Sequence, residues 1–190
     1  MELSDLDSNR SAAIPAALLT APVYGINLRA DTLRGNLGPE GTMLVFLRHF
    51  GCMFCREMVA DLRAQSVADG EREGILFFYQ GTVPEGREFF AEHWPSARAI
   101  ADQTLKFYQG FGVPKASLAQ VISPVVWQSG MKTWARGHRP AITQRNVRQM
   151  PGFMWVHDGR IVWRHDFEHV GDHPNLRELP HFSLRASINA

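Results

Sequence analysis

One stretch of this chain decides its fold: residues 43–63, which read MLVFLRHFGCMFCREMVADLR. The first five residues, Met43 to Leu47, form a continuous apolar run, which is typical of a strand buried on both faces. From Phe54, between the two cysteines of the stretch, apolar residues recur at helical spacing, as Phe54, Met58 and Leu62. The stretch therefore predicts a strand, a turn and a helix, with two cysteines at the junction.

The residues that follow continue this alternation of strand and helix. Residues 75–79 (ILFFY) predict a second strand, and a strand, helix and strand in this order form a parallel pair with a right-handed crossover. Residues 82–94 predict a helix with Pro84 in an early position. Residues 100–108 predict a strand step and a short helix, with Asp102 as its N-cap.

The clearest hairpin signal lies near the C-terminal end. Phe153 to Val156 and Arg160 to Arg164 are joined through Asp158-Gly159, a dipeptide that favours a turn with positive φ. Between this hairpin and the predicted sheet, residues 117–136 have a helical pattern that Pro124 interrupts. We expect this segment to be a helical insertion beside the core.

The chain contains two cysteines, Cys52 and Cys55. The predicted junction places Cys52 at or just before the first helical turn and Cys55 one turn further, on roughly the same face. Unpaired N–H groups at a helix N-terminus stabilise a thiolate, and Arg48, His49 and Arg56 lie within four positions of one cysteine or the other. We therefore expect a lowered pKa for the exposed cysteine and, as a consequence, attack on disulfides and peroxides.

Two other interpretations of the cysteine pair remain open, a zinc site and inert core thiols. A structural zinc site needs four ligands, for which His49 and the histidines at 165, 169 and 173 are candidates. Covalent haem attachment is disfavoured because Arg56, not histidine, follows the second cysteine. Two buried structural thiols would also be chemically ordinary. We expect no metal and no cofactor.

Length and composition favour one domain over residues 1–190, with a core at about 43–166 and extensions at both ends. Twenty basic and 19 acidic residues give a net charge of +1, which predicts no nucleic-acid partner. No apolar run approaches the roughly 20 residues of a membrane span, so no membrane partner is expected. The first ten residues lack the basic start of a secretory signal, which favours a cytoplasmic location.

The order of four segments resembles the thioredoxin superfamily and, within it, the peroxiredoxin-like AhpC/TSA branch that carries CxxC. These segments are MLVFLRHFGCMFCREMVADLR, ILFFYQG, IADQTLKFYQGFGV and MPGFMWVHDGRIVWRH. The resemblance implies an α/β fold, a thioredoxin-like three-layer α/β/α sandwich whose mixed sheet ends in a C-terminal β-hairpin, with the helical insertion added.

The resemblance also implies roles for individual residues. Cys52 is then the exposed attacking thiol and Cys55 the resolving thiol. Met150-Pro151 corresponds to the cis-proline element, which packs against the CxxC and offers backbone groups to a thiol substrate. The substrate-binding residues that follow from this correspondence are Phe50, Gly51, Met53, Met150 and Pro151.

The peroxiredoxin motif PxxxTxxC leaves the attacking residue open. Overlaid on Cys55, it places Arg48 where proline is expected and Cys52 where threonine is expected. On that overlay Cys55 attacks peroxide, whereas the thioredoxin overlay gives the attack to Cys52. The active-site arginine of the family corresponds to Arg145 or Arg148, and Arg48, Arg56 and Arg148 are candidates for supporting the thiolate.

These observations predict a cysteine-dependent oxidoreductase, a peroxiredoxin-like antioxidant protein that cycles a CxxC dithiol. Its substrate would be a disulfide-containing protein, a small thiol or a peroxide. Its reductant would be an external thiol. The protein would be a monomer or a homodimer. One alternative is a thiol peroxidase that forms a cysteine sulfenic acid. Others are a non-catalytic binding module of the same fold and half of a zinc site.

Overall fold

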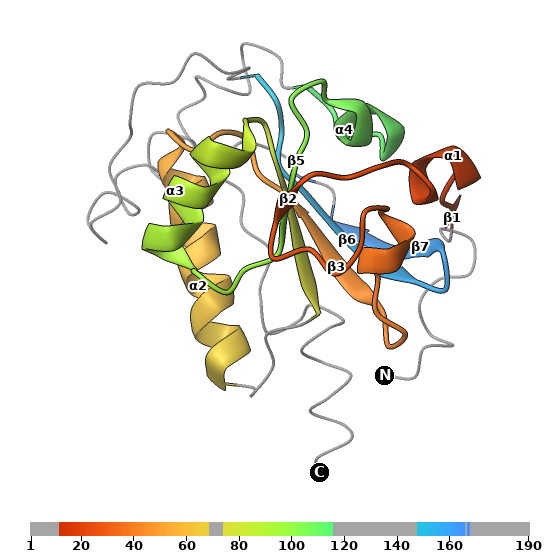
Figure 1. The fold of residues 1–190 in the computed structure, drawn as a ribbon, viewed down its shortest axis with the longest axis horizontal. Helices are drawn as coiled ribbons and strands as arrows, with labels where there is room; N and C mark the ends of the chain where they lie inside the picture. The colour runs from red at the N-terminus through yellow and green to blue at the C-terminus, as the bar shows by residue number, and fades with distance from the viewer. Residues whose placement is uncertain (1–11, 69–73, 116–147, 166, 168–190) are drawn as a thin grey trace.

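The computed structural model describes residues 12–68, 74–115, 148–165 and 167, which form a mixed sheet between two layers of helices (Figure 1). The sheet has seven strands in the order β1-β7-β6-β3-β4-β5-β2. Their bounds are β1 Ala12–Ala13, β2 Gly25–Ile26, β3 Thr42–Phe46, β4 Ile75–Tyr79, β5 Ala99–Ala101, β6 Gly152–His157 and β7 Arg160–His165.

The centre of the sheet is the predicted parallel unit. Strand β3 pairs in parallel with β4, and β4 pairs in parallel with β5. Every residue of β3 and β4 is buried, as the continuous apolar runs predicted. On its other side β3 pairs antiparallel with β6, so that Phe46, the last residue of β3, lies opposite Gly152, the first residue of β6.

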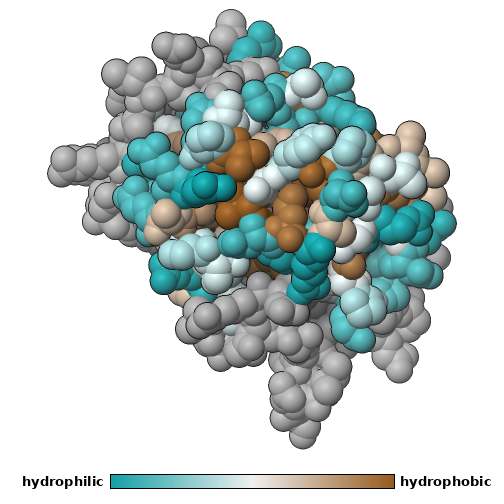
Figure 2. All heavy atoms as spheres, viewed as in Figure 1, coloured by the Kyte–Doolittle hydropathy of each residue, from teal (hydrophilic) through white to brown (hydrophobic). Residues whose placement is uncertain are grey.

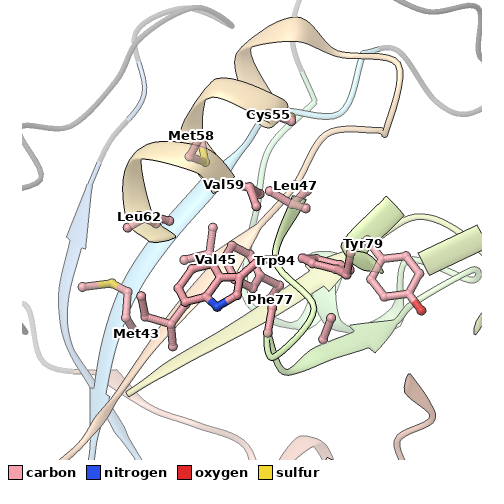
Figure 3. Close-up of a cluster of buried hydrophobic side chains, with 14 of the residues drawn as sticks. Met43, Val45, Leu47, Cys55, Met58, Val59, Leu62, Phe77, Tyr79 and Trp94 are labelled. Atoms are coloured by element: carbon pink, nitrogen blue, oxygen red, sulfur yellow. The ribbon is translucent and has the colours of Figure 1, made fainter. Parts of the chain in front are cut away.

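Two separate apolar cores lie on the two faces of the sheet. On one face, α2 (Met53–Ala68) and α3 (Val83–His93) cover the strands, and Figure 3 shows Met58, Val59 and Leu62 of α2 directed toward β3. On the other face, α1 (Ala16–Leu19) and α4 (Lys106–Gly110) pack against the alternate strand residues. This arrangement confirms the three-layer thioredoxin-like sandwich.

Local sequence explains where these helices begin. Helix α3 begins with a capping box, in which the Thr82 side chain accepts a hydrogen bond from the Glu85 amide and Glu85 bonds back to the Thr82 amide. Helix α4 differs from the prediction, because its N-cap is Leu105, with a φ of 60°, and not Asp102. The Asp102 carboxylate nevertheless accepts hydrogen bonds from the first amides of α4, at Lys106 and Phe107.

The predicted hairpin is confirmed and has the expected turn. Strands β6 and β7 are joined by Asp158 and Gly159, whose φ angles of 49° and 71° are both positive. Such a pair fits the twist of the two strands, and Asp-Gly adopts it at little cost.

The N-terminal extension contributes more than the sequence indicated. Strands β1 and β2, helix α1 and the 3-10 helix η2 (Arg34–Asn36) all precede the predicted core, and β1 and β2 form the two edges of the sheet. Figure 2 shows apolar residues in the middle of the face on which β2 lies, with hydrophilic residues around them. The predicted helical insertion at 117–136 lies outside the described residues. Among the residues that are described, no helix is long and apolar enough to cross a membrane.

The capping box of α3 yields a first prediction. Thr82→Ala removes the side-chain acceptor of the Glu85 amide and should lower the free energy of unfolding by about 1 kcal/mol, measured by urea denaturation. Thr82→Ser keeps the hydroxyl and should stay close to the wild type. Equal stability of the Ala and Ser variants would contradict this role of the cap.

Candidate functional site

The two cysteines lie where the sequence placed them, at the junction between a buried strand and a helix. Cys52 directly precedes α2, and its carbonyl accepts the amide hydrogens of Cys55 at 3.1 Å and Arg56 at 3.3 Å. Cys52 therefore occupies the position that opens the helix, and Cys55 lies in its first turn. Both are free thiols and both are buried, Cys52 at 5% exposure and Cys55 at 1%, so the prediction of an exposed Cys52 is wrong.

Arg48 contacts both sulfur atoms from the chain that leaves β3. Its guanidinium Nη1 donates to Cys52 Sγ at 3.3 Å, and its backbone amide donates to Cys55 Sγ at 3.3 Å. The side chain is itself buried, at 6% exposure. Water screens such a contact much less than it would at the surface. The positive charge therefore lies at Cys52, while Cys55 receives a neutral donor.

A second contact of Arg48 connects this site to the segment before β6. Arg48 Nε donates to the backbone carbonyl of Gln149 at 2.9 Å. The register of the sheet explains this contact between distant parts of the sequence. Because Phe46 lies opposite Gly152, the chain just after β3 runs beside the chain just before β6. Gln149, which directly precedes Met150-Pro151, therefore contacts the same arginine that contacts both sulfurs.

The two thiols ionise very differently in this environment. A hydrogen bond from the Cys55 thiol and the nearby Arg48 guanidinium lower the pKa of Cys52 to about 6, against the opposing effect of its burial. The pKa of Cys55 is raised well above its usual value, because its thiol donates to Cys52 and because it is buried. At neutral pH the pair is a Cys52 thiolate that accepts a hydrogen bond from the Cys55 thiol.

His49 does not supply the positive charge that the sequence suggested. Burial and the charge of Arg48 lower its pKa to about 4, so the imidazole is neutral at pH 7. Its Nδ1 atom is buried and has no hydrogen-bond partner. The expectation that His49 assists the thiolate by charge is therefore wrong, because a charge beside a buried guanidinium costs more than a neutral ring.

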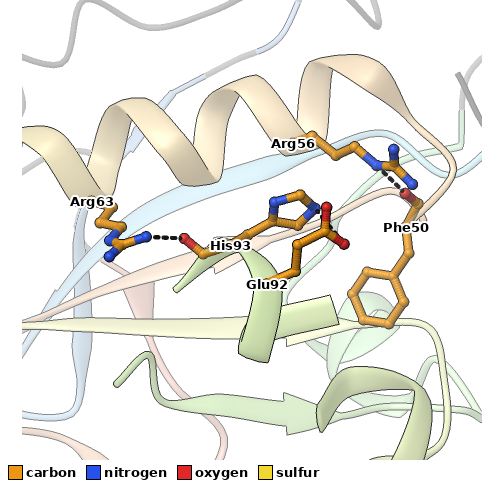
Figure 4. Close-up of polar contacts among 5 residues, drawn as sticks. All are labelled: Phe50, Arg56, Arg63, Glu92 and His93. Carbon is orange, nitrogen blue, oxygen red and sulfur yellow. Dashed lines mark hydrogen bonds and ion pairs between the residues drawn. The ribbon is translucent and has the colours of Figure 1, made fainter. Parts of the chain in front are cut away.

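Arg56 and Phe50 hold the loop that leads into α2. Arg56 Nε donates to the carbonyl oxygen of Phe50 at 3.0 Å, as Figure 4 shows. The Phe50 ring stacks on Phe89 of α3, with 4.2 Å between the ring centroids, and lies 5.1 Å from the ring of Tyr79. Arg63, further along α2, donates to the His93 carbonyl and joins the helix to the end of α3 (Figure 4).

The candidate substrate-binding residues are buried or half-buried. Phe50 and Met53 are half-buried and pack against the core, and Met150 is buried at 2% exposure. Gly51 and Pro151 are buried as well. These five residues therefore present mainly main-chain groups to a substrate.

The Met150–Pro151 bond departs from the resemblance. All peptide bonds of the described residues are trans, including this one, whereas the resemblance implied a cis-proline element. The segment is instead fixed by hydrogen bonds, because the Met150 amide donates to the Pro114 carbonyl at 3.0 Å and Gln149 Nε2 donates to the same carbonyl at 2.9 Å.

Of the two candidates for the family arginine, one lies among the described residues. Arg148 is exposed, and Arg145 lies outside the described residues. The zinc interpretation finds no further ligands in the part of the chain that the structure describes, where no group of three or more histidine, cysteine or acidic residues is suited to a metal ion. His169 and His173 lie outside that part.

Sequence reasoning missed three polar residues that hold the loop between β3 and α2. Gln80 Nε2 donates to the Arg48 carbonyl, and the Tyr108 hydroxyl donates to the carbonyls of Leu47 and Phe78. Gln149 is the third, through its carbonyl contact with Arg48. The available signal for Gln80 was its place directly after a buried strand, where a polar side chain needs a partner.

Comparison with known proteins gives one family and a consistent fold. Residues 59–169 match the family model of the AhpC/TSA antioxidant enzymes, and this match begins after both cysteines. Among curated protein sequences none is significantly similar to this chain.

Solved structures of low sequence identity share the fold. A cysteine variant of peroxiredoxin Q from Xanthomonas campestris superimposes with a TM-score of 0.54 at 15% identity, covering 94% of this chain and 98% of that one. A Xanthomonas campestris bacterioferritin comigratory protein, described in connection with alkyl peroxide reduction, gives a TM-score of 0.50 at 16% identity and covers 82% of this chain and 87% of its own. At these identities the likeness concerns the fold alone.

The ionisation of the pair gives a second prediction. The rate of Cys52 alkylation by iodoacetamide, followed by peptide mass spectrometry, should rise with pH around a midpoint near 6, because the thiolate is the reacting species. Cys55→Ala removes the thiol donor and should move this midpoint to higher pH. A midpoint above 8 in the wild-type protein would contradict the geometry described here.

Proposed function

Because the chain belongs to the AhpC/TSA antioxidant-enzyme family, we propose that it is a thiol oxidoreductase that cycles Cys52 and Cys55 between a dithiol and a disulfide. The observation that carries this proposal is the asymmetry of the pair. One sulfur receives a guanidinium and a thiol donor, whereas the other keeps its proton. A dithiol with one reactive and one protonated sulfur suits a two-step exchange.

In the proposed cycle, Cys52 is the attacking residue and Cys55 the resolving residue. The Cys52 thiolate attacks one sulfur of a substrate disulfide and releases the other as a thiolate. Cys55 then gives up its proton and attacks Cys52, which frees the second substrate thiolate and leaves the Cys52–Cys55 disulfide. An external thiol reductant, as cytoplasmic thiol systems supply, returns the pair to the dithiol.

The backbone around the pair is proposed to hold the substrate. The segment at Gln149 to Pro151 is held by Arg48, which contacts both cysteines, and by the chain at Pro114. An extended substrate next to this segment would find main-chain groups and few exposed side chains. We therefore propose recognition through the backbone carbonyls of Met150 and Pro151, because the Met150 amide already bonds to the Pro114 carbonyl and proline has no amide hydrogen.

Peroxide reduction is a second candidate, favoured by the family match. In this reaction Cys52 thiolate and a hydroperoxide, with one proton, give Cys52 sulfenic acid and an alcohol or water. Cys55 then condenses with the sulfenic acid, which forms the disulfide and releases one water. The position of Arg48 makes Cys52, and not Cys55, the candidate for attack in this reaction as well.

Variants of the two cysteines test both reactions. One equivalent of hydrogen peroxide or of a small aromatic disulfide should make the reduced wild-type protein two hydrogens lighter, by intact mass spectrometry. Cys55→Ser should instead accumulate a sulfenic or mixed-disulfide adduct on Cys52. Cys52→Ser should react at least about tenfold more slowly, because its remaining thiol stays protonated.

The comparison of the reagents distinguishes the two candidates. Reaction with the disulfide alone would support exchange without peroxidase activity, and reaction with peroxide would support the second candidate. If Cys52→Ser is as fast as Cys55→Ser with both reagents, the assignment of the attacking residue is wrong. If neither variant exceeds the rate of a free thiol, the proposal of an oxidoreductase fails.

A further inference from the structure

We propose that Arg48 makes the Cys52–Cys55 pair an oxidant, which accepts electrons from substrate dithiols. This inference rests on the proposed exchange between Cys52 and Cys55, and it states that Arg48 favours the reverse of the direction written above, in which the pair oxidises a dithiol. It starts from the contact of one guanidinium with one sulfur, at 3.3 Å between Arg48 Nη1 and Cys52 Sγ. When the peroxiredoxin motif is overlaid on Cys55, Arg48 stands where that motif has proline, and a proline has no side-chain donor for this contact.

The contact favours one redox state over the other. A thiolate exists at Cys52 only when the pair is reduced, because both sulfurs of a disulfide are uncharged. The attraction between the guanidinium and the sulfur therefore stabilises the dithiol form and not the disulfide form. A pair whose reduced form is stabilised in this way takes electrons from other dithiols more readily.

The position of Arg48 is fixed independently of the sulfur. Its Nε bonds to the Gln149 carbonyl at 2.9 Å, and its own carbonyl accepts a hydrogen bond from Gln80. Its backbone amide is directed at Cys55 Sγ. Because these contacts do not involve the charge of Cys52, the guanidinium is already in place when the thiolate forms.

The surrounding titratable groups do not replace this charge. His49, beside Arg48, is neutral at pH 7. Tyr108 of α4 keeps its proton, because burial and the nearby Cys55 raise its pKa well above the usual value. On α2, Arg56 bonds to the Phe50 carbonyl and Glu57 is buried, while Arg148 is exposed on the neighbouring segment.

The oxidising reaction balances with the groups described. The Cys52–Cys55 disulfide and a substrate dithiol give a Cys52 thiolate, a Cys55 thiol, a substrate disulfide and one proton. A hydroperoxide, the oxidant of the second candidate function, restores the protein disulfide. The hydroperoxide accepts two electrons from the Cys52 thiolate and the Cys55 thiol. With the thiol proton and one further proton, it gives an alcohol and water.

The test compares the wild type with Arg48→Met in glutathione redox buffers at pH 7 and pH 5. At pH 7 the equilibrium constant for oxidation of glutathione by the pair should fall about tenfold in the variant, which is ~30 mV toward a more reducing pair. At pH 5 the two proteins should differ little, because Cys52 is then mostly protonated in both. Arg48→Lys keeps the charge and should recover most of the wild-type value at pH 7.

Arg63→Met is the matched control, because this arginine of α2 is exposed and bonds to the distant His93 carbonyl. It should leave the equilibrium unchanged at both pH values. A shift in Arg48→Met of equal size at pH 5 and pH 7 would identify a purely structural role and overturn the proposal. So would an unchanged equilibrium at pH 7, and in that case the proposed function would still stand.

A measurement on the wild type alone applies if Arg48→Met does not fold. The redox potential of the pair should fall as the pH rises. Its slope against pH should be that of two protons per two electrons below pH 6 and that of one proton per two electrons above pH 6. A single slope up to pH 8 would overturn the role of Arg48. If the wild-type pair does not equilibrate with glutathione at all, the proposed function itself fails.

Discussion

The contact between Arg48 and Cys52 constrains the rest of the structure. Burying a guanidinium is costly unless its donors meet acceptors, and here two of those acceptors are a sulfur at the start of α2 and the carbonyl of Gln149. The sulfur belongs to a residue four positions from Arg48 in the sequence, and the carbonyl to a residue 101 positions away. The end of β3, the start of α2 and the approach to β6 must therefore keep their relative positions.

The sheet and α4 supply that rigidity. Asp102 accepts hydrogen bonds from the amides of Phe107 and Tyr108, which fixes the first turn of α4. The Tyr108 hydroxyl then bridges the carbonyls of Leu47 and Phe78, just where the two central parallel strands end. Side chains in the layer opposite α2 thus determine where the loop before Cys52 begins. The position of the Cys52 thiol therefore depends on both helical layers.

Local patterns in the sequence predicted the centre of this fold, and tertiary contacts account for what they missed. The apolar run at Ile75 to Tyr79 gave the exact strand, and Asp158-Gly159 gave the exact turn, because burial on both faces and positive φ leave strong local signals. Strands β1 and β2 have two residues each, too few for any periodicity.

At the site, the sequence identified both cysteines and Arg48 but not how they are related. The link from Arg48 to Gln149 depends on the register of β3 and β6, which no local pattern encodes. The charge state of His49 was mispredicted because its burial was unknown, and burial reverses the preference of an imidazole for the charged form. The trans bond at Met150–Pro151 is the ordinary state of an X-Pro bond, and only the resemblance to the family implied a cis bond there.

The two short edge strands have a consequence for how the chain is assembled. Only residues 14–24 separate β1 from β2, yet these strands lie at opposite margins of seven strands, about 29 Å apart along the sheet at ~4.8 Å per spacing. Helix α1 and the turn after it, in which Thr20 is helical and the Ala21 amide bonds to the Leu18 carbonyl, fold the first part of this segment, and Pro22 then pairs with Thr32. The segment crosses one face of the sheet and buries its apolar side chains there, so the two edge strands are joined through eleven residues of chain as well as through the sheet.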